Sequence, residues 1–148
     1  MRDLIYCGTD PVGPQNTQAL LTGSFSAVWS PPIHRHATAE PGDRVWLLWR
    51  GAQEATPVVL GAGIVTATPD GRVEWTNRTA PGIVTAAREQ GYAGPTNMAF
   101  LRLRDVMVPP GRLVVAGLGA VAIGLSAATE LQSERLHAVL PLASVSTT

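Results

Sequence analysis

The segment "RVWLLWR", residues 44–50, constrains the fold of this chain more than any other. In an extended strand, successive side chains point to opposite faces. Both faces of this segment are apolar: one carries Val45, Leu47 and Trp49, the other Trp46 and Leu48. A strand that is apolar on both faces has to be covered on both, which predicts a central strand of a sheet.

Turn signals on either side of this strand predict a hairpin. "PGD" at 41–43 predicts a tight turn in which the Asp43 carboxylate caps backbone N–H groups. The next apolar run, "VVLGAGIVTAT" at 58–68, predicts the partner strand, with Gly61 and Gly63 on one face. Two glycines in one row let a ring or another backbone approach closely, or mark a bend of a barrel, and Trp46 is the ring expected over them.

The remaining pattern predicts an α+β domain. Further strands are expected at 4–8, 25–29, 72–76 and 98–108, and helices at 16–23, 79–91 and 129–141, the last capped by Thr129. The run 113–125 fits a strand or a buried loop. No repeat or low-complexity linker divides the chain, so we expect one domain over 1–148. The predicted architecture is a small twisted antiparallel β-barrel or curved sheet flanked by two or three short helices.

Charge and cysteine content narrow the functional classes. The formal net charge is +0, so no global basic field indicates nucleic-acid binding, although a local basic patch remains open. The single Cys7 rules out an internal disulfide and fits a reducing cytoplasm. We expect no signal peptide, and the run 113–125 is too short to span a bilayer, so the expected location is cytoplasmic without a membrane partner.

No motif indicates catalysis, a metal or a cofactor. His34 and His36 lie two residues apart in a loop, and a third metal ligand would have to come from His137 or a carboxylate, so no metal site is predicted. Cys7 lies in an apolar strand and is expected to be buried rather than nucleophilic. Glu74 alternates with Val73 and is expected to point to solvent. We therefore expect a protein that is not an enzyme and needs no cofactor.

The aromatic residues carry the main functional signal. The chain has four Trp but two Phe and two Tyr, and Trp29, Trp49 and Trp75 fall at or near strand ends. Flat rings at the mouth of a sheet hold planar bases by stacking, while the alternative for each ring is core packing. An arginine follows each ring within a few residues: Arg35, Arg50 and Arg78. A ring beside a cation suits a nucleotide with its phosphates, whereas a solvated surface is the alternative for each arginine alone.

The order of three motifs resembles PUA-like domains, especially their EVE and YTH branches. These motifs are "AVWS", then "GDRVWLLWRG", then "GAGIVTA", and they cover about residues 25–67. The resemblance implies a small twisted barrel and a binding module for DNA or RNA that carries a modified base. It also implies that Trp29 forms one wall of an aromatic cage and that Ser30 contacts the base edge. The second cage ring is left open between Trp49 and Trp75, and His34 lies near the rim.

Two other functions compete with base binding. A non-enzymatic assembly protein would pair its apolar strands across a subunit interface, with the small residues of 113–125 packing closely in a homodimer. An enzyme acting on a nucleotide-like ligand would need an acid or base in the pocket, for which His34 is the nearby candidate.

Overall fold

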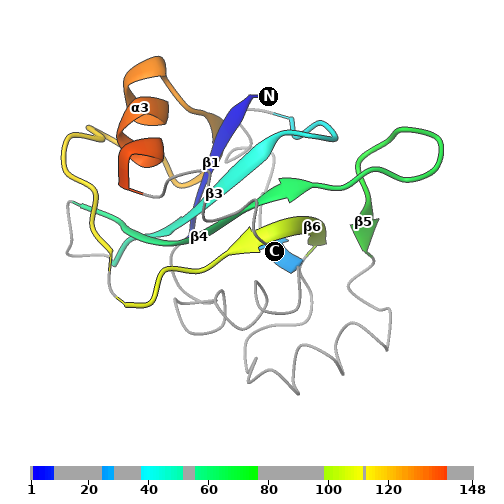
Figure 1. The fold of residues 1–148 in the computed structure, drawn as a ribbon, viewed down its shortest axis with the longest axis horizontal. Helices are drawn as coiled ribbons and strands as arrows, with labels where there is room; N and C mark the ends of the chain where they lie inside the picture. Colours follow the sequence, from blue (N-terminus) through cyan, green and yellow to red (C-terminus); the bar gives the residue numbers. More distant parts are fainter. Residues whose placement is uncertain are drawn as a thin grey trace.

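The computed structural model describes residues 2–8, 25–28, 38–51, 56–76, 99–111 and 113–139, with backbone alone at 25–28, 75–76 and 99–100. These residues form a curved sheet of seven strands with one helix beside it (Figure 1). The elements are β1 (Asp3–Gly8), β2 (Phe25–Val28), β3 (Arg44–Trp49), β4 (Val58–Val65), β5 (Trp75–Thr76), β6 (Ala99–Met107), β7 (Gly124–Ala127) and α3 (Glu130–Val139). Each predicted strand range contains a strand, although β5 covers only Trp75–Thr76 of 72–76, and Trp29 and Met98 lie outside the described residues. The helix expected at 129–141 is observed over Glu130–Val139, and the helices expected at 16–23 and 79–91 lie outside the described residues.

The sheet is mixed rather than antiparallel. Its strand order is β2-β6-β4-β3-β1-β7, and β5 also pairs with β6. β1 runs parallel to β3, while the other pairs are antiparallel. The prediction of an antiparallel sheet was therefore wrong at β1, because the alternation within a strand does not reveal a pairing between strands far apart in sequence. Within the described strands the sheet is open, with β2 and β7 at its ends, so a closed barrel is not confirmed.

The central hairpin is confirmed, but the role expected of Trp46 was wrong. β3 lies between β1 and β4, and Val45 to Leu48 are at most 1% exposed. Trp46 pairs with Ala62, whereas Gly63 pairs with Val45 and faces β6. A Cβ on Gly63 would lie 3.0 Å from the Leu103 Cβ, so Leu103 and not Trp46 takes up the space that the glycine leaves.

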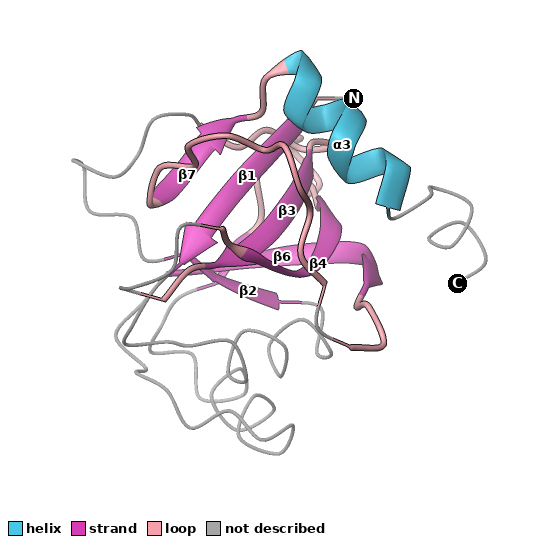
Figure 2. Cartoon of the chain, turned by 90° about the vertical axis from the view of Figure 1, so that its left-hand side faces the viewer, coloured by secondary structure: helices cyan, strands magenta, loops and turns pink. Residues whose placement is uncertain are grey.

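The sheet has an apolar cluster on each face. The first cluster contains buried Leu4, Tyr6, Ala39, Val45, Leu47, Val58, Leu60, Val65, Leu101, Leu103 and Leu125. The second contains Ile5, Cys7, Trp46, Leu48, Val59, Ala62, Val115, Leu118, Val121 and Leu136. Leu136 comes from α3, which lies beside β1 and β3 in Figure 2 and covers this second face. The helix therefore completes a core that the sheet alone leaves exposed.

Two predicted caps are confirmed. Asp43 Oδ2 accepts a hydrogen bond from the Glu40 backbone N–H at 2.8 Å, and Gly42 between them has a φ of 89°, which favours glycine. At the start of α3, the Gln132 N–H donates to Thr129 Oγ1 at 3.1 Å and the Thr129 N–H donates to Gln132 Oε1 at 2.9 Å. This reciprocal pair is a capping box, which fixes where the helix begins.

The run 113–125 resolves into a loop followed by a strand. Val114 forms an isolated bridge with Val58, and β7 begins at Gly124. Between them Val115, Leu118 and Val121 are buried in the second cluster, so both alternatives left open by the sequence contribute. In the part of the chain that the structure describes, no helix is long and apolar enough to cross a membrane.

Candidate binding site

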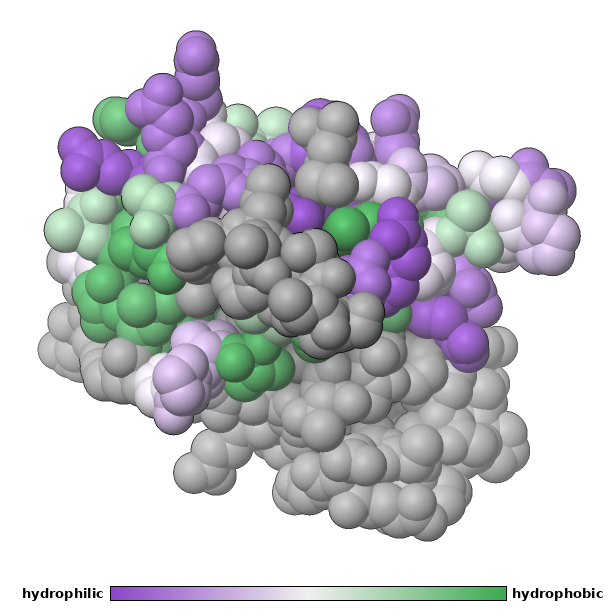
Figure 3. Space-filling model, viewed as in Figure 1, coloured by the Kyte–Doolittle hydropathy of each residue, from purple (hydrophilic) through white to green (hydrophobic). Residues whose placement is uncertain are grey.

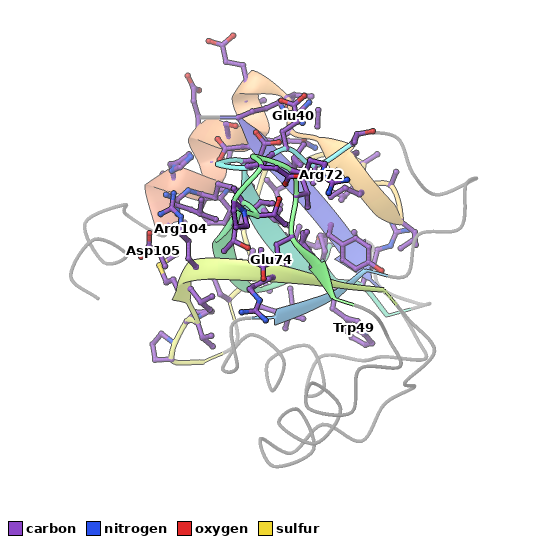
Figure 4. All side chains as sticks on the ribbon, turned by 90° about the vertical axis from the view of Figure 1, so that its right-hand side faces the viewer. Glu40, Trp49, Arg72, Glu74, Arg104 and Asp105 are labelled. Carbon is purple, nitrogen blue, oxygen red and sulfur yellow. The ribbon has the colours of Figure 1, made fainter. Side chains whose placement is uncertain are left out.

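Trp49 lies at the end of β3 with a half-buried ring. Its backbone pairs with Gly8 of β1 and with Val58, the first residue of β4. The ring packs against the first apolar cluster, and its indole nitrogen Nε1 is buried with no hydrogen-bond partner in the described part of the chain. Figure 4 shows the labelled side chain at the lower edge of the sheet, away from Glu40 and Arg72. Trp49 is thus partly core and partly surface.

Arg50 directly follows Trp49 and extends the pairing of β3 with β1. Its backbone N–H donates to the Gly8 carbonyl at 3.0 Å, which continues the parallel ladder. Burial raises the pKa of the Cys7 thiol to about 11, and the Arg50 charge acts in the other direction. Cys7 belongs to the second cluster and Trp49 packs on the first, so the Arg50 charge acts on a thiol that lies on the opposite face from the Trp49 ring. Cys7 itself is buried, as the sequence predicts.

Trp75 belongs to a different end of the sheet. Its backbone pairs with Leu101 of β6, beyond the end of β4, while Trp49 pairs with the start of β4. Figure 1 shows β5 at the right-hand end of the sheet and the end of β3 at the left. Of the two candidates for a second cage ring, Trp49 and Trp75, the register brings Trp75 to the part of β6 that also pairs with β2.

Five predicted site residues lie outside the described residues: Trp29, Ser30, His34, Arg35 and Arg78. The described residues that precede two of them are close in register, because Val28 pairs with Ala99 and Thr76 pairs with Phe100. β2 and β5 therefore flank the first half of β6 on its two sides. The chain enters the segments with Trp29 and Arg78 from neighbouring positions.

A polar cluster that the sequence did not reveal joins α3 to the sheet. Asp3 Oδ2 accepts a hydrogen bond from Ser133 Oγ at 2.7 Å and lies 2.9 Å from His137 Nε2. Asp3 Oδ1 accepts from Trp46 Nε1 at 3.0 Å. The His137 ring also meets Trp46 edge to face, with ring centroids 5.1 Å apart. Ser133 and His137 are four residues apart and so share one helix face. This spacing is the signal in the sequence from which the helix half of the cluster could have been predicted.

This cluster has catalytic residue types without a catalytic arrangement. In a hydrolase triad the serine bonds the histidine, which takes its proton. Among the described residues, Ser133 and His137 both bond Asp3 rather than each other, so the cluster lacks the serine–histidine bond of a triad and instead connects α3 to β1. The described residues also hold no group of three or more His, Cys, Asp or Glu side chains placed to bind a metal ion.

Glu74 departs from its prediction. Its side chain is 30% exposed and pairs with Arg102, Oε1 to Nε at 3.1 Å. Its other oxygen accepts a hydrogen bond from Thr66 Oγ1 at 3.1 Å. The carboxylate of this residue, which precedes β5, therefore bonds the residue that follows β4 and pairs with β6 instead of pointing freely to solvent.

The described residues thus define an α+β domain in which one helix covers an open mixed sheet. No family model matches the sequence, and no curated protein matches it. Among solved structures, the chain is similar to ASCH from Zymomonas mobilis, with a TM-score of 0.46 and 11% identity over 93% of this chain and 95% of that one. A mutant of the same protein gives 0.42 and 9% over 94% and 99%. ASCH domains belong to the PUA-like superfamily, but similarity this low does not assign the chain to a family.

Proposed function

We propose that this chain is a non-catalytic cytoplasmic module that binds DNA or RNA by holding a planar, modified base between Trp29 and Trp75. The observation that supports this choice is the register of β2 and β5, which pair with the two sides of the first half of β6. Val28 and Trp75 both pair within the first three residues of that strand. Rings that start from the two neighbours of one strand can enclose a base by stacking on both of its faces.

The other residues of the proposed site divide into two roles. Ser30 follows Trp29 directly and contacts the base edge. His34, Arg35 and Arg78 meet the phosphates at the rim, where arginine suits both phosphate and ring contacts. Trp49 and Arg50 are left out of this site, since Trp49 pairs with the far end of β4.

The test compares single tryptophan variants against short oligonucleotides. Trp29→Ala and Trp75→Ala should each lose binding of single-stranded RNA or DNA that carries a methylated adenine or cytosine, with the thermal transition retained. Trp49→Phe is the matched control, and it should bind like the wild type. Unfolding of Trp29→Ala would show that this ring is core, and undiminished binding by both alanine variants would equally overturn the proposal.

Self-assembly is a second candidate function, favoured by the surface near the 113–123 loop. Val114 is 45% exposed and Val108 39% exposed, and Figure 3 shows apolar atoms gathered on the left side, where Figure 1 draws this loop. Sedimentation at micromolar concentration tests it. A homodimer that Val114→Asp converts to a monomer supports this function, and a wild-type monomer contradicts it.

A further inference from the structure

Arg44 is a buried cation with free hydrogen-bond donors. The residue is 3% exposed, and its Nε and Nη1 atoms are buried without a hydrogen-bond partner among the residues that the structure describes. Buried polar groups in folded proteins are almost always paired, and a guanidinium has no acceptor capacity with which to adapt. Burial lowers the pKa of this group. Two unpaired donor atoms on one buried guanidinium therefore mark a place that suits an acceptor.

The neighbouring carboxylates are engaged elsewhere. Asp3 and Asp105 both act electrostatically on Arg44. However, Asp3 accepts its hydrogen bonds from Trp46 and Ser133 and contacts His137. Asp105 Oδ2 instead pairs with Arg104 Nη1 at 2.6 Å. Neither carboxylate forms a hydrogen bond to the Nε or Nη1 of Arg44.

A second arginine lies in the same row of the sheet. Arg44 and Arg104 are both paired with Ile64, one from β3 and the other from β6. Residues directly opposite each other in an antiparallel pair project to the same face, so both arginines lie on the face that α3 covers. Their backbones lie two strand spacings apart, about 9.6 Å, on either side of Ile64, whose side chain projects to the same face. An ion held by both long arginine side chains would therefore lie over Ile64.

The difference in exposure between the two arginines indicates from which side an ion would reach Arg44. The Arg104 side chain is 54% exposed and that of Asp105 is 40% exposed, whereas Arg44 lies beneath the surface. Asp105 also has a φ of 49°, in the left-handed region that side chains rarely adopt. The ion pair at the surface is thus the part of this row that an incoming ion meets first.

We propose that Arg44 and Arg104 form a binding site for a phosphate-type oxyanion. The ion takes the place of Asp105 on Arg104 and accepts hydrogen bonds from the free donors of Arg44. Such an ion supplies both the acceptor atoms and the negative charge that a buried guanidinium needs, which a water molecule does not. Inorganic phosphate and the phosphate of a nucleotide share this chemistry. The site lies apart from the proposed base site and does not depend on it.

Calorimetric titration of the wild-type protein with inorganic phosphate, in chloride buffer at constant ionic strength, tests the site. We expect saturable binding that is about tenfold weaker in Arg104→Gln, which loses one charged donor group. Asp105→Asn removes the competing carboxylate while keeping a residue that tolerates a positive φ, so it should bind phosphate more tightly than the wild type. Arg44→Met should bind no phosphate and should melt at a higher temperature, because a buried unpaired charge is removed.

Two controls separate this site from general anion effects and from the base site. Arg72→Gln alters an arginine that is 81% exposed in another loop and should leave the phosphate affinity unchanged. Trp29→Ala should also leave it unchanged. The titrations are repeated with a nucleoside 5′-monophosphate and with a short RNA. The probe whose affinity falls in Arg104→Gln identifies the source of the phosphate. The proposal is wrong if the wild type binds none of these probes, or if Arg104→Gln and Asp105→Asn bind them with wild-type affinity. Arg104→Gln and Asp105→Asn decide the outcome even if Arg44→Met does not fold.

Discussion

The indole Nε1 of Trp46 donates a hydrogen bond to Asp3 Oδ1 at 3.0 Å, and this bond joins the central strand β3 to its parallel neighbour β1. The same carboxylate accepts from Ser133 and contacts His137, both on α3. One side chain therefore connects the two strands to the helix that covers them. Asp3, the first residue of β1, thus bonds β3 on one side and α3 on the other, and α3 covers the second apolar cluster.

Replacing Asp3 by alanine should destabilise the protein by about 3 kcal/mol, because the donors of Trp46, Ser133 and His137 lose a shared, charged acceptor. Urea unfolding measures this as a lower midpoint with an unchanged slope. Asp70→Ala is the control: Asp70 lies in an exposed turn, where solvent screens its contacts with Thr68 and Arg72, so the midpoint should shift much less. Equal midpoints for the two variants would contradict the role given to Asp3.

The Asp3 carboxylate should also make stability depend on pH in the acid range. Burial raises the pKa of Asp3, but the hydrogen bonds from Ser133, Trp46 and His137 together outweigh it and hold the pKa below its ordinary value of 3.8. A depressed pKa adds stability that is fully present above the unfolded-state pKa and is lost as the pH falls through the folded-state pKa. Below about pH 5 the free energy of unfolding should therefore fall more steeply for the wild type than for Asp3→Asn. Parallel pH profiles would rule this out.

The Cys7 thiol should resist alkylation in the folded protein. Burial raises the pKa of Cys7 from 9.0 to about 11, so the reactive thiolate is about a hundredfold rarer near neutral pH than in the unfolded chain. Mass spectrometry after iodoacetamide treatment at pH 8 should find the native protein unmodified and the urea-unfolded protein fully modified. Comparable rates in the two states would show that β1 opens readily.

The elements of this fold could be predicted from local pattern because each rests on nearby residues. The two apolar faces of 44–49 predict a central strand, and Thr129 as a cap predicts the start of α3, where the structure adds Gln132 as its partner. The parallel pairing of β1 with β3 could not be predicted in this way, since it depends on which distant strands meet. The same limit applies to Glu74, whose partner Arg102 belongs to another strand.

In the candidate sites, too, local features could be predicted from the sequence and contacts between distant strands could not. The alternation in "FLRLRD" predicts that Arg104 faces away from the buried Leu103, and the structure confirms it. What the sequence does not show is that Arg44 shares a row with Arg104 through Ile64. The one feature of the sequence that points to Arg44 is its charge at the start of an otherwise apolar strand. The charged groups that act on Arg44 come from β1 and β6, and β6 is distant from it in sequence.

Gly63 should tolerate no larger side chain, because β6 fills the space above it. A Cβ at this position would lie 3.0 Å from both the Cβ and the Cδ1 of Leu103 and 3.3 Å from Val106 Cγ2. The Leu103 Cβ belongs to a backbone that β4 holds in register, so it cannot move aside as the end of a flexible side chain does. Gly63→Ala should therefore cost about 2 kcal/mol through overpacking, seen as a lower urea midpoint with an unchanged slope. Gly111→Ala is the matched control: nothing lies within 4 Å of its Cβ position, so its midpoint should not fall. If Gly63→Ala unfolds at the same midpoint as Gly111→Ala, the close approach of β6 to β4 is not what requires glycine there.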